Sequence, residues 1–136
     1  MNREDLKNYK YVQIWIKDQT EYIETQKGTI NKLNSILSDM PKGSRAVYDR
    51  EAEKLAELED MFDELMNIII EEEKKQKKIV EMVSKMDFPY RNILYKEYIQ
   101  GKTLVTVASE MHYNYEYTKR LNGEALNKFD KIGVEE

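Results

Sequence analysis

The segment SDMPKGS, residues 38–44, separates two long helical patterns and decides the fold. Its proline biases the preceding residue away from helix, and its glycine and serines suit a turn followed by a new helix start. On both sides, apolar residues recur at alternating spacings of three and four, which is the seven-residue repeat of a coiled-coil seam. We therefore predict an antiparallel helical hairpin over residues 1–86, with its turn at 38–46.

Both arms of the predicted hairpin carry a full seam. The first seam is Tyr9, Val12, Ile16, Gln19, Ile23, Gln26, Ile30, Leu33 and Leu37; the second is Leu55, Leu58, Phe62, Leu65, Ile69, Glu72, Gln76, Ile79, Val83 and Met86. Further apolar residues lie beside the seams, at Tyr11, Trp15, Tyr22, Met61, Met66, Ile68 and Ile70. Because these stripes would form an exposed apolar patch, we predict a homodimer through the hairpin. The alternative is that the stripes pack against the C-terminal domain of the same chain.

The composition favours helices and excludes several kinds of site. Charged residues make up 35% of the 136 residues, and there are only five glycines and two prolines. With no cysteine and the single histidine His112, disulfides and zinc-thiolate sites are excluded, and we predict no metal site, cofactor or catalytic residue. No run of 18 apolar residues exists and the first ten residues are polar, so we expect a cytoplasmic protein with no membrane partner.

A different pattern follows the hairpin. The segment DFP at 87–89 ends the second long helix and starts a domain that we place at 87–131, followed by a frayed tail at 132–136. We predict helices over 89–99, from residue 104 to 111, and from 115 to about 129. Thr103 and Asn114 are the expected N-caps, and residues 112–114 the turn. A short helix, a tight turn and a longer helix are the outline of a helix-turn-helix. The predicted fold class is all-α.

The last predicted helix presents polar side chains where a recognition helix enters the major groove. Arg120 is suited to a bidentate contact with guanine, Glu116 to accepting from cytosine, and Lys119 to a phosphate. Tyr115 is suited to a sugar or a thymine methyl group. The predicted DNA-binding residues are Tyr115, Glu116, Lys119, Arg120, Thr103 and Asn114. The tyrosines at 113, 115 and 117 alternate along the chain, so we do not predict a shared stacking surface for single strands.

The same stretch resembles a known family. LVTVASEMHYNYEYTKRLNGEALNKF, residues 104–129, is similar to region four of bacterial sigma factors, without a gap. With MPKGS at 40–44, LYKEYIQG at 94–101 and RLNGEAL at 120–126, the chain also resembles small sigma-like regulators encoded by phages and mobile elements of Gram-positive bacteria. The resemblance implies a transcription regulator of phage or mobile-element genes that works with RNA polymerase. Val105 and Asn122 depart from its pattern, where an aromatic residue and a histidine are expected.

The charge of the predicted domain limits its binding to double-stranded DNA. Residues 87–131 hold seven Lys and Arg against six Asp and Glu, a net charge of +1. Because phosphate neutralisation supplies most non-specific affinity, we expect weak binding by one domain, strengthened by dimerisation or by tethering to RNA polymerase. Two other functions remain open at this point: a helical scaffold or assembly protein, and a DNA-packaging recognition subunit of a phage.

Overall fold

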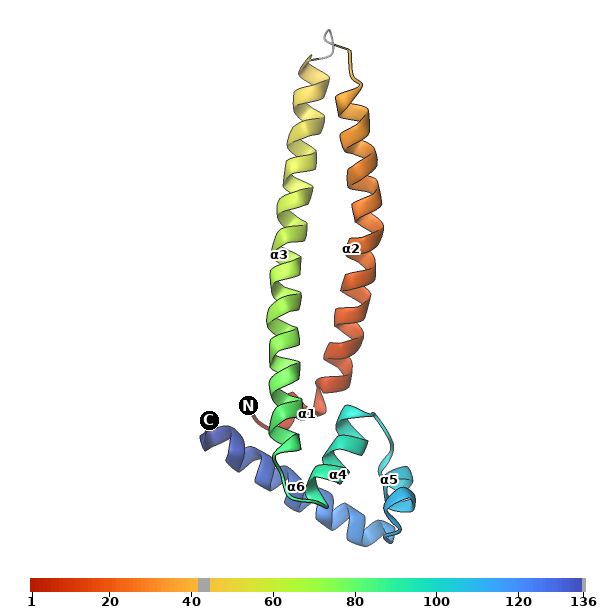
Figure 1. Ribbon diagram of the computed structural model, residues 1–136, viewed down its shortest axis with the longest axis vertical. Helices are drawn as coiled ribbons and strands as arrows, with labels where there is room; N and C mark the ends of the chain where they lie inside the picture. The colour runs from red at the N-terminus through yellow and green to blue at the C-terminus, as the bar shows by residue number, and fades with distance from the viewer. Residues whose placement is uncertain (42–44, 136) are drawn as a thin grey trace. The chain divides into compact units, whose positions relative to one another are not determined.

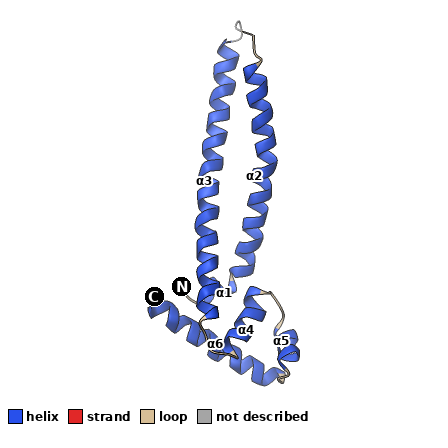
Figure 2. Cartoon of the chain, viewed as in Figure 1, coloured by secondary structure: helices blue, strands red, loops and turns tan. Residues whose placement is uncertain are grey.

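The computed structural model describes residues 1–41 and 45–135, and all regular structure in that part of the chain is helical (Figure 2). The predicted all-α fold is confirmed. The elements are α1 (Arg3–Lys7), α2 (Tyr9–Ser38), α3 (Arg45–Ser84), α4 (Tyr90–Leu94), the π-helical segment η2 (Tyr95–Ile99), α5 (Leu104–Met111) and α6 (Tyr115–Glu135). They form two compact units: the hairpin unit, Trp15–Glu72, and the terminal unit, Met1–Ile14 with Glu73–Glu136.

In the hairpin unit, α2 and α3 run side by side in opposite directions (Figure 1). The buried side chains are Ile16, Ile23, Leu37, Leu55, Phe62 and Ile69. Every predicted seam position is buried or partly buried, while the α2 positions between seam residues are exposed. The Tyr22 ring lies 5.9 Å from the Phe62 ring, between the two helices. The two predicted seams are therefore confirmed.

The predicted turn is described in part. Helix α2 ends at Ser38, where the Asp39 amide donates to the carbonyls of Ser35 and Ile36 at 3.3 Å. Helix α3 begins at Arg45. The turn residues at 42–44, which include the predicted glycine and the serine N-cap, lie outside the described residues.

The terminal unit has the larger core. It gathers the end of α3, α4, α5 and α6 around Ile79, Met82, Val83, Met86, Ile93, Leu94, Val107, Leu121, Ala125, Leu126 and Phe129. The predicted buried residues of the 89–99 segment are confirmed, with Ile93 and Leu94 fully buried and Tyr98 and Ile99 partly buried. This core fixes the position of α5 and α6.

The observed division of the chain differs from the predicted hairpin over 1–86, because the N-terminus and the end of α3 from Glu73 onward belong to the terminal unit. Asn2 caps α1: its Oδ1 accepts from the amides of Glu4 at 3.0 Å and Asp5 at 3.3 Å, and its own amide donates to Asp5 Oδ2 at 3.0 Å. This capping box holds the short helix in place. Leu6, on the inner side of α1, is fully buried in the terminal core.

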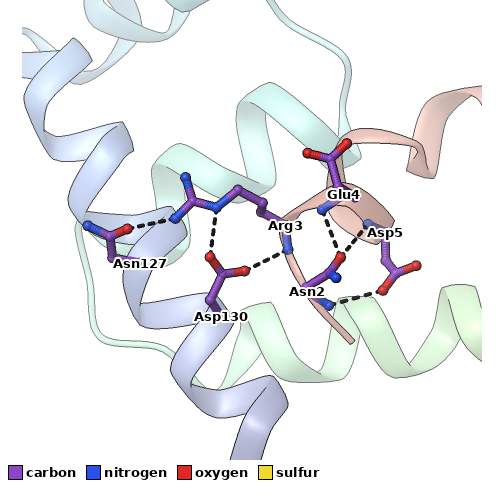
Figure 3. Close-up of polar contacts among 6 residues, drawn as sticks. All are labelled: Asn2, Arg3, Glu4, Asp5, Asn127 and Asp130. Carbon is purple, nitrogen blue, oxygen red and sulfur yellow. Dashed lines mark hydrogen bonds and ion pairs between the residues drawn. The ribbon is translucent and has the colours of Figure 1, made fainter.

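A second link joins the N-terminus to α6 (Figure 3). The Arg3 amide donates to Asp130 Oδ1 and the Arg3 Nε to Asp130 Oδ2, both at 2.7 Å, while Nη2 donates to Asn127 Oδ1 at 2.6 Å. Burial of the Asp130 carboxylate raises its pKa, but the hydrogen bonds from Arg3 outweigh this effect and hold the pKa below its ordinary value. Paired donors on one carboxylate give the contact a defined geometry.

The predicted frayed tail at 132–136 is wrong for the described residues, since α6 continues to Glu135. Ile132 packs against the terminal core and extends the helix beyond Phe129. Gly133 lies against the backbone of Met1, and a Cβ atom there would collide with the Met1 carbonyl oxygen. A glycine thus lets the N-terminus approach α6 closely.

The predicted helix over 89–99 forms, but its second half widens into a π-helix. The Gln100 amide donates to the Tyr95 carbonyl at 2.9 Å, five residues back, which is the π-helical pattern. Gly101 follows with a φ of +73°, where residues with a side chain are strained, and it ends the helix as predicted. The π-helical segment packs against α1 and α5.

Glu97, on this π-helical segment, is expected to make stability depend on pH. Its Oε2 is buried, and among the described residues no hydrogen-bond partner contacts it. Burial raises the pKa of Glu97 from 4.5 to about 6, although Lys7 opposes the shift. The folded protein therefore holds a proton that the unfolded chain releases, so stability falls as pH rises from 4.5 to about 6.

The Glu97→Gln variant removes this effect. At pH 7 we expect it to raise the free energy of unfolding by about 1 kcal/mol, with the gain lost below about pH 4.5. Urea unfolding at both pH values measures the difference. The exposed Glu57→Gln variant is the control, and an equal gain in both variants would contradict the assignment.

Candidate nucleic-acid interface

The candidate interface is built on α5, the turn after it and the start of α6. Thr103, in extended conformation, caps α5: its Oγ1 accepts from the Thr106 amide at 3.3 Å. Asn114 caps α6: its Oδ1 accepts from the Tyr117 amide at 2.7 Å. Both predicted N-caps are confirmed. Each satisfies backbone donors that a helix start leaves free, which fixes where the helix begins.

The turn itself depends on His112. This residue has a φ of +59°, the left-handed conformation that ends a helix sharply. The following Tyr113 amide donates back to the Ala108 carbonyl at 3.0 Å, which closes the end of α5. His112 is exposed, as a turn residue is expected to be. Within the part of the chain that the structure describes, no cluster of three or more metal-ligating side chains occurs.

The inner faces of α5 and α6 pack together as the sequence predicts. Val107 and Ala108 of α5 are buried, as are Leu121 and Ala125 of α6. Thr118 is fully buried, and its hydroxyl donates to the Asn114 carbonyl at 2.9 Å. A small residue at 108 lets the two helices approach, and the hydrogen bond removes the penalty of burying the hydroxyl. The helix-turn-helix outline is therefore present.

The opposite face of α6 holds the predicted reading residues. Tyr115, Glu116, Lys119 and Arg120 are all exposed. They lie within the first two turns of the helix, at spacings of one, three and one, which places them on one side. Thr103 and Asn114 are exposed too, but their side-chain oxygens are engaged as caps.

One feature of this face is a pair of ring contacts that the sequence interpretation missed. The Tyr113 and Tyr117 rings meet edge to face, with centroids 5.0 Å apart. The Arg120 guanidinium lies over the Tyr117 ring, 5.3 Å from its centroid. Both contacts could have been predicted from the spacing, which is four residues from Tyr113 to Tyr117 and three from Tyr117 to Arg120. Because the cation–π contact restrains Arg120, the side chain is partly positioned before any ligand binds.

Fewer cations face outward than the sequence count suggests. Lys102 Nζ donates to Glu110 Oε1 at 2.7 Å, and Lys96 Nζ to Glu110 Oε2 at 3.1 Å. Hydrogen bonds from Lys102 and then from Lys96 lower the pKa of Glu110 below its ordinary value. Two of the seven basic residues of 87–131 are thus engaged by one carboxylate. This pairing reduces the positive charge available for phosphates.

The two departures from the sigma-like pattern have different locations. Val105 on α5 is 66% exposed and contributes nothing to the core. Asn122 is partly buried and its Nδ2 donates to the Tyr98 hydroxyl at 3.4 Å. Asn122 therefore contacts η2 inside the terminal unit, away from the four exposed reading residues.

Protein-family models, curated proteins and solved structures contain no match to this chain. The resemblance of residues 104–129 to sigma region four stays a prediction, as does the resemblance of residues 40–44, 94–101 and 120–126 to small sigma-like regulators. Among the described helices, none combines the length and the apolar character needed to cross a membrane.

Proposed function

We propose that this protein is a sequence-specific double-stranded-DNA-binding regulator of transcription, sigma-like, cytoplasmic and without enzymatic activity. The observation that carries the proposal is the polar face of Tyr115, Glu116, Lys119 and Arg120 on the first turns of α6. A buried contact with α5 and two capped helix starts hold that helix rigidly. Residues of these types, on an exposed helix of this kind, match the base edges and phosphates of a major groove.

RNA polymerase is the partner that the charge argument favours. Residues 87–131 carry a net charge of only +1, and Glu110 engages two of their seven cations, so the affinity of this segment for phosphates is low. Tethering to polymerase at a promoter raises the effective concentration of α6 near its site without new DNA contacts. The resemblance to phage and mobile-element regulators supports the same assignment.

Selection of sequences from a random double-stranded DNA pool tests the function. We expect a defined motif to be enriched, and more strongly when RNA polymerase is added. A motif that is equally enriched without polymerase would favour a DNA-packaging recognition subunit. If no motif emerges under either condition, the DNA-binding proposal is wrong and a helical scaffold is favoured.

Single substitutions on α6 test which residues bind. Arg120→Ala is expected to weaken the preferred site by ~1–3 kcal/mol and to relax one base position, because a bidentate base contact is lost. Lys119→Ala is expected to weaken all sequences about equally and to reduce the salt slope by ~1, since one phosphate contact is lost. Fluorescence anisotropy over a salt series measures both effects.

Lys131→Ala is the matched control. Lys131 is an exposed cation on the same helix, eleven residues beyond Arg120. Removing it changes the net charge by the same amount as the test variants. Three variants with equal affinities and equal base preferences would exclude this face as the DNA-reading surface.

A further inference from the structure

An apolar stripe runs beside the seam along each helix of the hairpin unit. It consists of Trp15, Tyr22 and Ile36 on α2 and Val47, Met61 and Ile68 on α3. Their exposed fractions range from 36% to 52%, whereas the seam residues that follow five of them are buried: Ile16, Ile23, Leu37, Phe62 and Ile69. The spacings are multiples of seven, so each stripe follows its helix in parallel with the seam.

The two stripes lie on the same side of the hairpin. Five of the six stripe residues come one position before a seam position; Trp15 precedes Ile16, for example, and Met61 precedes Phe62. Val47 lies fourteen positions before Met61 and so keeps the same register. In antiparallel helices that face each other, equal offsets from the seam point to the same side. On α2, the positions just after the seam are Gln13, Thr20, Lys27 and Asn34, which are polar and exposed. Along α2, therefore, only the side that carries the stripe is apolar.

The stripes also match in height along the hairpin. The Tyr22 ring contacts Phe62, the residue after Met61, so Tyr22 and Met61 lie within about one helical turn of the same height. Trp15 is then level with Ile68, and Ile36 with Val47. One polar layer, Thr29 with Lys54, completes the series. The result is a face two helices wide and ~32 Å long at 1.5 Å per residue.

We infer that this stripe face binds the stripe face of a second copy of the chain, forming an antiparallel four-helix dimer. The six apolar residues, at 36–52% exposure, leave roughly 500 Å² exposed per chain, more than half of the ~800 Å² per partner of a standard interface. A second two-helix layer can pack against a flat face of two parallel stripes, and another copy of the chain provides such a layer. The inference does not depend on the proposed DNA binding.

The residue sequence of each stripe favours the antiparallel arrangement. A two-fold axis through the middle of the face pairs Trp15 with the partner's Ile36, and Tyr22 with the partner's Thr29. On α3 the same axis pairs Met61 with the partner's Lys54, whose aliphatic stem covers it. Each polar residue, Thr29 or Lys54, then faces an apolar residue of the partner. In a parallel arrangement, the Lys54 layers of both chains would meet each other.

Charged residues at the edge of the face also favour the antiparallel arrangement over the parallel one. In the antiparallel arrangement, Asp18 lies level with the partner's Lys32, and Glu64 with the partner's Arg50, so opposite charges meet. In the parallel arrangement, Asp18 would face the partner's Glu64, so like charges would meet. Charge complementarity of this kind sets the orientation of helical partners.

Sedimentation equilibrium of the full chain tests the dimer. At about 20 µM we expect twice the chain mass of 16.3 kDa, and Ile68→Glu is expected to raise the dissociation constant at least ~100-fold. Ile70→Glu is the matched control, because Ile70 is 41% exposed on the same helix but outside the stripe face. A wild-type mass of 16.3 kDa at about 100 µM, or equal effects of both variants, would overturn the inference.

Two further variants test the orientation. The chain has no cysteine, so Thr25→Cys adds a single thiol close to the proposed two-fold axis, where it meets its own copy. Mild oxidation is expected to give a disulfide-linked dimer, whereas Thr20→Cys, on the polar side, is expected to give none. Asp18→Lys is expected to weaken the dimer about tenfold, and adding Lys32→Asp to restore it. Crosslinking that does not distinguish Thr25→Cys from Thr20→Cys would exclude the antiparallel arrangement.

Discussion

Replacing Ile69 with aspartate is expected to unfold the hairpin unit at temperatures where the parent is folded. Ile69 is 3% exposed at the centre of the α3 seam. A carboxylate at this position is taken out of water with no cation beside it in the seam, which costs about 3–5 kcal/mol. Because α2 and α3 bury their seams against each other within the hairpin unit, the two helices should melt together there. Circular dichroism at 222 nm, followed against temperature, measures the effect.

The neighbouring position supplies a matched control. Ile70 has the same side chain on the same helix but is 41% exposed. Ile70→Asp is expected to change the free energy of unfolding by less than about 0.5 kcal/mol, as surface substitutions usually do. Equal melting temperatures for Ile69→Asp and the parent would show that the seam assignment is wrong.

The second large effect is expected at the N-terminus, where Leu6→Ala should destabilise the terminal unit by about 2–5 kcal/mol. Leu6 is fully buried, and its truncation leaves a cavity among side chains of the terminal core. Hydrogen exchange of the α6 amides should become faster, although α6 lies more than a hundred residues away in sequence. Denaturant unfolding combined with exchange measures both results.

Tyr11→Ala is the control for this prediction. Tyr11 is larger than Leu6 but 70% exposed, and its removal opens no cavity. We expect the exchange of α6 to stay at the parent rate in this variant. Unchanged α6 exchange in Leu6→Ala would mean that the N-terminus is not part of the terminal core.

Much of the fold follows from periodicity in the sequence. A seam residue such as Ile23 or Phe62 recurs every seven positions, and that repeat alone predicts both the helix and its buried side. Thr103 and Asn114 are recognisable because an N-cap depends on residues two or three positions away. The exposed face of α6 follows from the same local geometry. The sequence thus contains the helices, their buried sides and the candidate reading residues.

Other features depend on contacts between distant residues. A single leucine in the five-residue α1 has no periodic pattern, so only the tertiary structure shows that Leu6 joins the terminal core. The Arg3–Asp130 pair spans 127 positions, and each side chain taken alone resembles an ordinary surface charge. Patterns of spacing report which side of a helix is buried, but they do not identify the residues that cover it. Tertiary packing determines which residues cover a buried side. In this protein it places the N-terminus in the terminal unit, where the sequence predicted the hairpin.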